Sequence, residues 1–230
     1  MNILAFDTAA TSCGCAIAAH GEIVWWRCEP LARGHAERLP AMVAEGLKET
    51  GLSSGALDRI AVTTGPGGFT GVRVGLAMAR GLALRDDGAT PIVAVTTLKV
   101  IAAEALAAPD GLLVGLIDAR RGEHYVQIFD AGLSPLCEPA AEPLAAIAEM
   151  AGDMAAGRRT YFIGSGAGEA ARLAAARGVD AEALGDAESP DPRTLARLAA
   201  DAPTTADPKP VYVRPPDAVP TAMRKPARHE

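Results

Sequence analysis

Two aspartates, each at the end of an apolar run, are the side chains in this chain best suited to hold a metal–nucleotide complex. Asp7 closes a run near the start of the chain, and Asp118 closes a similar run near its middle. The carboxylate of such a residue offers two oxygens to a metal ion on a phosphate. It can equally cap a turn by accepting backbone N–H bonds, which for Asp7 would come from Ala9 or Ala10. The capping role is the interpretation we favour for both residues.

A glycine-rich stretch, Gly65–Gly71, is the second feature with chemical potential, and we call it the first glycine loop. Its four glycines follow an apolar run and precede a helix-like segment. Glycines let the backbone turn tightly and approach another group, and a strand–loop–helix junction directs free N–H groups and the helix dipole at one point. Such a junction suits a phosphate or another anion. The residues that would form this vestigial nucleotide or anion site are Asp7, Thr8, Gly65, Gly67, Gly68, Thr70 and Asp118.

Two common phosphate-binding motifs do not fit this loop. The motif Gly-x-x-x-x-Gly-Lys-Ser/Thr needs a lysine, and none occurs between Lys48 and Lys99. The motif Gly-x-Gly-x-x-Gly fails at its last place, where Thr70 stands. Anion binding is therefore a secondary hypothesis. The leading one is that the loop is a turn that aims the following helix at a partner.

Neither the histidines nor the cysteines form a metal-binding pattern. A helix presents two imidazoles to one metal only at a spacing of three or four residues, and no two histidines have it. The histidines are His20, His35, His124 and His229. Among the four cysteines, Cys13 and Cys15 are too close together for a zinc knuckle, and there is no second cysteine pair to complete a zinc site. We therefore predict no metal site and no catalytic residue.

The composition favours a folded protein that does not grip nucleic acid by itself. The 230 residues carry a net charge of −6, whereas a protein that binds nucleic acid alone usually has a basic face. No apolar run reaches the length of about 18 residues that a membrane span needs. The chain starts at Met1 directly in a strand-like run, with no basic leader segment. We expect a cytoplasmic protein with no membrane attachment.

The order of predicted elements repeats once and indicates an α/β fold of two similar units. The first unit has strands at 3–7, 14–19, 23–27, 58–63 and 91–95 and helices at 35–50, 70–84 and 96–107. The second has a strand at 112–117, a turn at 119–123, strands at 124–129 and 160–163, and a glycine loop at 164–168 before a helix. An aspartate and a glycine loop recur in the same order in both, which is typical of a duplication.

A proline- and glycine-containing stretch, 108–111, is the predicted boundary between the units. It divides the chain into an N-terminal unit at 1–108, a C-terminal unit at 109–205 and a proline-rich tail at 206–230. Within the tail, Pro210–Arg214 could form a short edge segment. Two helix ends are also predicted, with Gly51 after the first helix and Thr97 as the N-cap of the third.

The first two predicted helices carry the residues expected to meet a partner. Leu39 and Met42 recur at helical spacing and indicate an amphipathic helix. Gly71, Gly75 and Ala79 lie four apart and would let a partner helix approach closely. The full set expected at this interface is His35, Glu37, Leu39, Met42, Gly71, Arg73, Gly75, Ala79 and Arg80.

Other interpretations exist for several members of that set. His35 and Glu37 would need a nearby nucleophile to act as a catalytic pair, and the sequence nominates none. Arg73 and Arg80 share a helix face and could bind partner carboxylates or an anion, or lie in solvent. A bulky residue at Gly75 is expected to abolish partner binding and leave the fold intact.

Paired strand–aspartate–turn–strand units that face glycine loops resemble the plan of the actin/Hsp70/sugar-kinase superfamily. Several strings are also similar to those of the TsaB (YeaZ) family, over a stretch from Met1 to about Arg214. They are Ile3–Thr8, His35–Pro40, Gly65–Gly75, Asp118–Glu123 and Pro210–Arg214. The resemblance implies duplicated actin/Hsp70-like (RNase H-like) subdomains, each a mixed sheet with flanking helices.

The resemblance to the TsaB family implies a non-catalytic subunit. Such proteins work with the homologous catalytic subunit TsaD and the ATPase TsaE, which together transfer threonylcarbamoyl from its adenylate to N6 of the adenosine beside the anticodon of ANN-decoding tRNAs. TsaD carries a His-x-x-x-His metal pair, which this sequence lacks. The resemblance further implies a heterodimer with a TsaD homologue, a homodimer when alone, and tRNA contact only through the complex. No cofactor is expected, although ATP or ADP could lie at a subunit junction.

A stand-alone enzyme of the same fold is the alternative. An ATP-dependent phosphotransferase or a peptidase-like hydrolase would need an open cleft between Asp7, Asp118 and the two glycine loops. Magnesium-dependent ATP binding that is lost in Asp7→Ala would favour this alternative.

Overall fold

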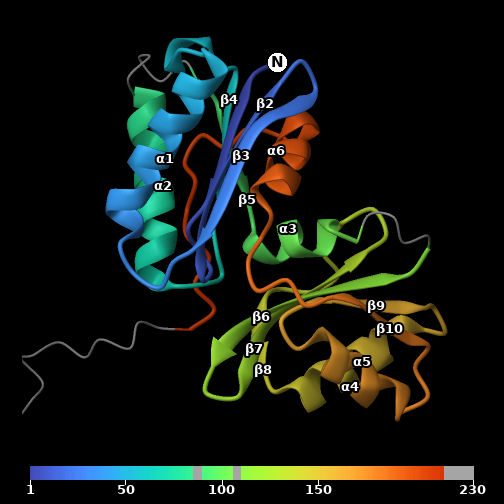
Figure 1. Ribbon diagram of the computed structural model, residues 1–230. Coiled ribbons are helices and arrows are strands. Elements are labelled where there is room, and N and C mark those ends of the chain that lie inside the picture. The colour runs from blue at the N-terminus through green and yellow to red at the C-terminus, as the bar shows by residue number, and fades with distance from the viewer. Residues whose placement is uncertain (85–89, 106–109, 215–230) are drawn as a thin grey trace, which may run out of the picture.

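Two five-stranded sheets with helices around them form the two lobes of the computed structural model (Figure 1). The structure describes residues 1–84, 90–105 and 110–214. The predicted boundary at 108–111 therefore lies partly outside the described residues, as does most of the predicted tail. None of the helices in the described ranges is long and apolar enough to cross a membrane.

The first sheet has the strand order β3-β2-β1-β4-β5. Its strands are β1 (Ile3–Asp7), β2 (Ser12–Ala19), β3 (Glu22–Pro30), β4 (Arg59–Thr63) and β5 (Ile92–Val95). The helices of this half are α1 (His35–Thr50), the short 3-10 helix η1 (Ser54–Ala56), α2 (Phe69–Leu84) and α3 (Thr97–Ala103). The strands β1, β2 and β3 form an antiparallel meander, and β4 and β5 run parallel to β1.

The second sheet has the strand order β10-β9-β6-β7-β8. Its strands are β6 (Leu112–Arg120), β7 (Glu123–Asp130), β8 (Ala140–Glu142), β9 (Thr160–Gly164) and β10 (Ala181–Gly185). The helices of this half are α4 (Leu144–Ala155), α5 (Ala167–Ala175) and α6 (Pro192–Asp201). Here too an antiparallel meander is followed by two parallel strands. The predicted α/β fold with two duplicated mixed sheets is confirmed.

Helices α1 and α2 lie side by side over one face of the first sheet (Figure 1). Leu39 and Met42 of α1 and Leu76 of α2 are fully buried against Phe6 of β1. The apolar spacing along α1 thus serves the chain's own core. Gly51 ends α1 in the left-handed conformation, with φ +70°, and its N–H donates to the carbonyl of Lys48, as predicted.

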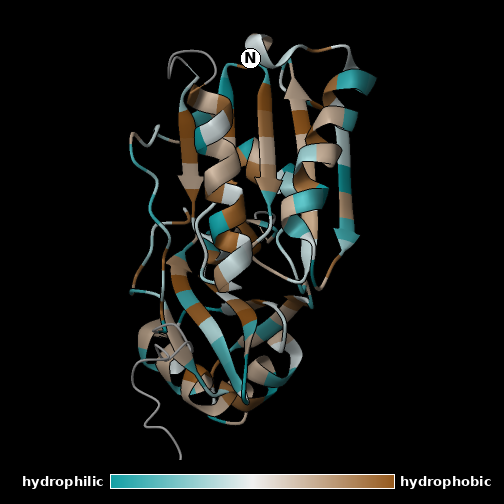
Figure 2. Ribbon diagram, turned by 90° about the vertical axis from the view of Figure 1, so that its left-hand side faces the viewer, coloured by the Kyte–Doolittle hydropathy of each residue, from teal (hydrophilic) through white to brown (hydrophobic). Residues whose placement is uncertain are grey.

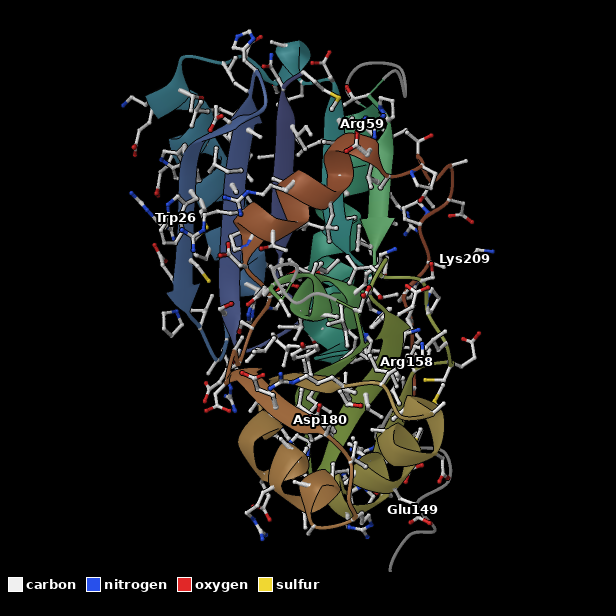
Figure 3. The ribbon with its side chains drawn as sticks, turned by 90° about the vertical axis from the view of Figure 1, so that its right-hand side faces the viewer. Trp26, Arg59, Glu149, Arg158, Asp180 and Lys209 are labelled. Atoms are coloured by element: carbon white, nitrogen blue, oxygen red, sulfur yellow. The ribbon has the colours of Figure 1, made fainter. Side chains whose placement is uncertain are left out.

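The last helix of each half packs on the sheet of the other half. Helix α3 lies against β6 and β7, and α6 lies against β1 and β2 (Figure 1). Helix α3 can approach β6 closely because Gly115 of β6 has no side chain. A Cβ at this position would stand only 2.6 Å from the carbonyl oxygen of Leu98 in α3. The C-terminal end of α6 is held by Arg59 of β4, whose Nη1 donates to the carbonyls of Ala199 (2.8 Å) and Ala202 (2.7 Å) (Figure 3).

This exchange corrects the predicted division of the chain. The sequence placed residues 109–205 in one C-terminal unit, but α6 completes the core of the first lobe. Its apolar residues Leu195, Ala196 and Ala199 are fully buried there with residues of β1 and β2. Helical spacing predicts a buried face but does not say which sheet that face will cover.

Several local predictions are also corrected. The N-cap of α3 is Thr96, whose hydroxyl accepts the N–H of Lys99 at 3.2 Å, rather than Thr97. Strand β6 continues to Arg120, so the hairpin turn before β7 is shorter than the predicted 119–123. Pro210–Arg214 forms no strand and instead belongs to an extended segment, 205–214, that we call the C-terminal strap.

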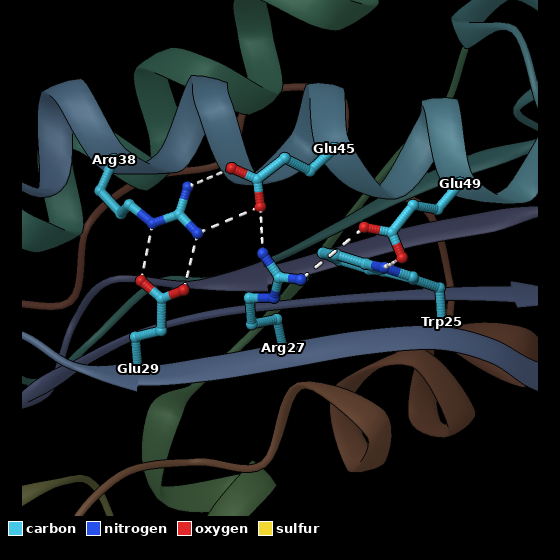
Figure 4. A network of polar contacts seen from close by, with 6 residues as sticks. All are labelled: Trp25, Arg27, Glu29, Arg38, Glu45 and Glu49. Atoms are coloured by element: carbon cyan, nitrogen blue, oxygen red, sulfur yellow. Dashed lines mark hydrogen bonds and ion pairs between the residues drawn. The ribbon is translucent and has the colours of Figure 1, made fainter.

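A network of charged side chains fixes α1 to β3 (Figure 4). Arg38 donates two hydrogen bonds to Glu29, at 2.7 and 2.6 Å, and two to Glu45, at 2.8 and 3.2 Å. Arg27 pairs with the same Glu45 and, at 3.7 Å, with Glu49. Hydrogen bonds from Arg38 lower the pKa of both Glu29 and Glu45 from its ordinary value. Two-pronged pairing of this kind fixes geometry better than a single exposed ion pair does.

Candidate functional site

Asp7 lies at the end of β1 with its carboxyl group closed off from solvent. Its exposed fraction is 1%. Oδ1 accepts the N–H of Ala9 at 3.1 Å and the hydroxyl of Thr63, and Oδ2 has no partner among the described residues. Burial raises the pKa of Asp7 to about 6, in spite of these hydrogen bonds, which lower it. The turn hydrogen bond that the capping role requires is thus present.

Asp118 occupies the equivalent place at the end of the first strand of the second lobe, but its side chain is exposed. Its Oδ1 accepts the N–H of Arg120 at 2.7 Å, two residues on, as Asp7 does with Ala9. Its own N–H donates to the hydroxyl of Ser165 in the second glycine loop at 2.5 Å. The duplication therefore repeats the capped turn of each hairpin, and the two carboxylates differ in burial.

Replacing Asp7 with asparagine is expected to stabilise the protein at neutral pH. The pKa of Asp7 is higher in the folded chain than its ordinary 3.8, so folding is accompanied by proton uptake between about pH 4 and about pH 6. The stability that the protonated carboxyl contributes is therefore lost as pH rises through this range. Asparagine keeps the acceptor for Ala9 and Thr63 and removes the buried charge. Chemical denaturation at pH 7 should show a gain of up to roughly 3 kcal/mol, and the gain should vanish at pH 4.

Asp118→Asn is the matched control for this prediction. It makes the same chemical change at the equivalent but exposed position, so the unfolding free energy should change by less than about 0.5 kcal/mol at either pH. If Asp7→Asn were as neutral as Asp118→Asn at pH 7, burial would not be what raises the pKa of Asp7.

The first glycine loop packs directly on the turn after Asp7. The N–H of Gly68 donates to the carbonyl of Ala9 at 2.7 Å, and the hydroxyl of Thr8 donates to the carbonyl of Gly71 at 2.7 Å. A Cβ at Gly71 would stand 1.8 Å from the carbonyl oxygen of Thr8. Glycine is required because backbone touches backbone here. The close approach expected from the sequence is thus made to the chain's own hairpin, and it fixes the start of α2.

A cavity of about 1020 Å³ lies beside this contact. Its walls are the turn after β1, the end of β3 and the loop before α1, the first turns of α1 and α2, Arg120 from the second lobe, and Glu188 and Ser189 before α6. The first turns of both helices meet the cavity together with Arg33 and Arg120, but Glu37 and Glu188 line it as well, so the charged side chains around it balance. Its volume is large enough for a small molecule.

The cavity brings together only part of the predicted anion site. Thr8, Gly68 and Thr70 line it, whereas the other predicted members do not. Those others are Asp7, Gly65, Gly67 and Asp118. Three residues of the predicted interface, His35, Glu37 and Gly71, also line the cavity. Arg33 and Arg120 were not among the predicted site residues, although Arg120 lies within the family-like string Asp118–Glu123.

Five residues of the predicted partner interface lie inside the chain's own core. Their exposed fractions are low because they pack on β1 and β4 or on each other; they are Leu39, Met42, Gly71, Gly75 and Ala79. A Cβ at Gly75 would stand 2.9 Å from the hydroxyl of Thr8 and 3.3 Å from Val62. The expectation that a bulky residue at Gly75 leaves the fold intact is therefore wrong.

Arg73 and Arg80 share one face of α2, as predicted, and both bind the C-terminal strap. Nε of Arg73 donates to the hydroxyl of Tyr212 at 2.8 Å, and Nη2 of Arg80 donates to the carbonyl of Pro208 at 2.5 Å. Both arginines are thus engaged within the chain rather than presented to a partner.

The outer surface of α1 and α2, turned away from the sheet, exposes a row of small side chains. The row consists of Pro40, Ala41 and Ala44 on α1 and Ala77 and Gly81 on α2, and we call it the two-helix face. Figure 2 views these helices in front of the sheet. The small residues of this face recur with the same helical period as the buried residues, half a turn away around each helix. The sequence alone could therefore have offered this face as an alternative partner interface.

The described residues contain no cluster of three or more His, Cys, Asp or Glu side chains that could hold a metal ion. The cysteines at 13 and 15 are buried in β2, and those at 28 and 137 are partly buried. Burial raises the pKa of Cys13 to about 12, so this thiol stays protonated at neutral pH.

Comparisons with known proteins give consistent matches. The family model described as "TsaD: tRNA N6-adenosine threonylcarbamoyltransferase" matches residues 29–195, which is more than half of the chain. The tRNA threonylcarbamoyladenosine biosynthesis protein TsaB of Bacillus subtilis is 34% identical over 129 residues, and that of Escherichia coli is 38% identical over 126 residues. These alignments cover 56% and 54% of this chain and 55% and 53% of the relatives. The chain thus spans about half the length of the curated relatives it matches.

A solved structure extends the similarity over almost the whole fold. YeaZ from Pseudomonas aeruginosa superposes with a TM-score of 0.74 at 27% sequence identity. The match covers 92% of this chain and 99% of that chain. A match of this extent takes in most of both lobes.

Proposed function

This chain belongs to the TsaD family defined by that model and to the TsaB (YeaZ) family that its relatives represent, and on this premise we propose that it serves tRNA threonylcarbamoyladenosine biosynthesis as a non-catalytic subunit. In this role it pairs with a TsaD homologue in the cytoplasm. The ATPase TsaE acts on the same complex. The group transferred is threonylcarbamoyl, and its acceptor is N6 of the adenosine beside the anticodon of ANN-decoding tRNAs.

The observation that carries the proposal is the two-helix face. Its side chains are small, which lets the helices of another chain approach α1 and α2 closely between the exposed charged residues that border it, such as Lys48, Arg73 and Arg80. The network around Arg38 fixes α1 on β3, so the face is held in one orientation (Figure 4). Rigid presentation of a face lowers the ordering cost of binding.

A non-catalytic role fits the chemistry of the residues present. The sequence has no pair of histidines at a spacing of three or four residues. Asp7, the carboxylate that a phosphate-transferring relative would use, is buried and serves as a turn cap. The transfer chemistry would then be performed by the TsaD homologue, and tRNA would be reached only through the complex.

The same face supports two further parts of the proposal. A homologous partner presents a similar pair of helices, so two copies of this chain would pair through the two-helix face when the partner is absent. The cavity opens beside the first turns of α1 and α2, the two helices that carry this face. ATP or ADP at the subunit junction would meet Arg33 and Arg120 on this chain, and also the carboxylates of Glu37 and Glu188.

The test is tRNA modification in vitro with purified TsaD and TsaE homologues, with and without this protein. We expect modification of an ANN-decoding tRNA only when all three are present. Full activity without this chain would remove the obligatory role, and activity of this chain alone would establish an enzyme.

A parallel measurement addresses the rival enzyme. Calorimetry of the isolated chain with ATP and Mg²⁺ should show no tight binding that depends on Asp7, because that carboxyl is closed off. Tight, magnesium-dependent binding that is lost in Asp7→Ala would favour a phosphotransferase or hydrolase over the scaffold.

A further inference from the structure

The C-terminal strap crosses from the first lobe to the second. It begins at the edge of the first sheet, where the N–H of Thr205 donates to the carbonyl of Ile92 in β5 at 2.6 Å. It then passes Arg80 of α2, which contacts Asp207 at 3.4 Å. At its far end, Nη1 of Arg214 donates to the carbonyl of Ala119 in β6 at 2.8 Å.

Within the first lobe, the strap holds the first glycine loop at two points. The N–H of Val211 donates to the carbonyl of Thr64 at 2.8 Å, just before the loop. The ring of Tyr212 stacks on that of Phe69, with centroids 5.0 Å apart. The guanidinium of Arg73 lies over the Phe69 ring, 3.8 Å from its centroid, so the two rings and the guanidinium pack together.

Within the second lobe, the strap holds the hairpin that carries Arg120. Arg214 forms an ion pair with Glu123 and a hydrogen bond with Ala119, so its contacts lie on both sides of Arg120 in the chain. Its side chain is 26% exposed. A partly buried guanidinium with both a carboxylate and a carbonyl partner is a stronger tether than an exposed ion pair.

Phe69 and Arg120, the residues whose neighbourhoods the strap holds, both line the cavity from opposite lobes. We propose that the C-terminal strap is a clasp that fixes the hairpin of the second lobe against the first glycine loop and so sets the width of the cavity. Without the clasp, the lobes remain joined by the exchanged helices α3 and α6, about which the second-lobe hairpin can move. The clasp acts in the isolated chain and does not depend on the proposed function.

Hydrogen–deuterium exchange of the full chain tests this. In Arg214→Ala, we expect amide exchange to rise by about five-fold or more in residues 64–71 and 118–124. Exchange in α4, which the strap does not contact, should stay unchanged. Glu123→Ala removes the ion pair from the opposite lobe and should reproduce the effect, and the double variant should exchange no faster than Arg214→Ala.

Lys209→Ala is the matched control. Lys209 lies in the strap and points to solvent at the edge of the first sheet, and its ion pair with Asp207, at 3.7 Å, stays within the strap (Figure 3). The amide exchange of the Lys209→Ala variant should equal that of the unaltered protein. Faster exchange in Arg214→Ala that is confined to residues 205–214 would overturn the proposal, because the strap would then only cover the surface. A uniform rise in exchange that includes α4 would overturn it as well, because it would indicate a general loss of stability.

Discussion

Gly71→Ala is expected to lower the free energy of unfolding by at least roughly 4 kcal/mol and the melting temperature by about 10 °C or more. The added Cβ would stand 1.8 Å from the carbonyl oxygen of Thr8 and 3.0 Å from its carbonyl carbon. Neither contact can be relieved by a side-chain rotation, because both involve backbone. The start of α2 would have to move off the β1–β2 turn, which breaks the hydrogen bond from the Thr8 hydroxyl to Gly71.

Gly81→Ala on the same helix is the control for this change. No atom lies within 4 Å of a Cβ built at Gly81, and the residue is exposed. Alanine should therefore stabilise α2 by about 1 kcal/mol through its higher helix propensity, with a rise in melting temperature of about 2–4 °C. Thermal unfolding followed by circular dichroism separates the two variants. Similar melting temperatures for both would mean that the loop does not touch the turn as described.

Ala77→Arg is expected to weaken binding to the TsaD homologue by at least about 100-fold while leaving the isolated chain folded. Ala77 is exposed at the middle of α2 on the two-helix face, so an arginine there costs the free chain little. In a close helix–helix contact, however, the side chain would bury an unpaired charge, which costs about 3 kcal/mol or more. Ala44→Arg on α1 should act alike. Calorimetric titration against the purified partner measures both.

Ala175→Arg, at an exposed place on α5 of the second lobe, controls for the added charge. It should bind the partner as the unaltered chain does. Loss of tRNA modification should follow loss of binding across the three variants. Wild-type affinity in both Ala44→Arg and Ala77→Arg would place the partner on another surface, whatever the outcome of the modification assay.

The elements that the sequence predicted well have strong local signals. Continuous apolar runs bounded by turns marked β1, β4, β6 and β9. Helix α1 was predicted to the residue, because its apolar period ends at Gly51, which takes the left-handed conformation that glycine favours. Four elements were missed, and one of them, α6, does separate its buried and polar residues at helical spacing, so its signal was present in the sequence. The other three, β8, α4 and β10, lie in alanine-rich stretches. Alanine occurs on buried and exposed faces alike, so such stretches carry little periodic contrast.

The candidate site was predicted less well, because the sequence does not show which side of a helix faces the sheet and which faces a partner. The small residues of α2 correctly indicated a close approach, but a helix has two sides, and the spacing of Gly71 and Gly75 does not say which one meets the sheet. Arg73 and Arg80 were correctly placed on one face. Their partners lie in the strap, more than a hundred residues further along the chain. Contacts of that separation leave no trace in local pattern.

The exchange of α3 and α6 bears on how such a chain could have arisen. Each half leaves part of its sheet to be covered by a helix that the other half supplies. A separate protein made of one half would expose that surface, and two identical copies could cover it by trading their last helices. The present chain has the form of such a swapped pair fused into one polypeptide.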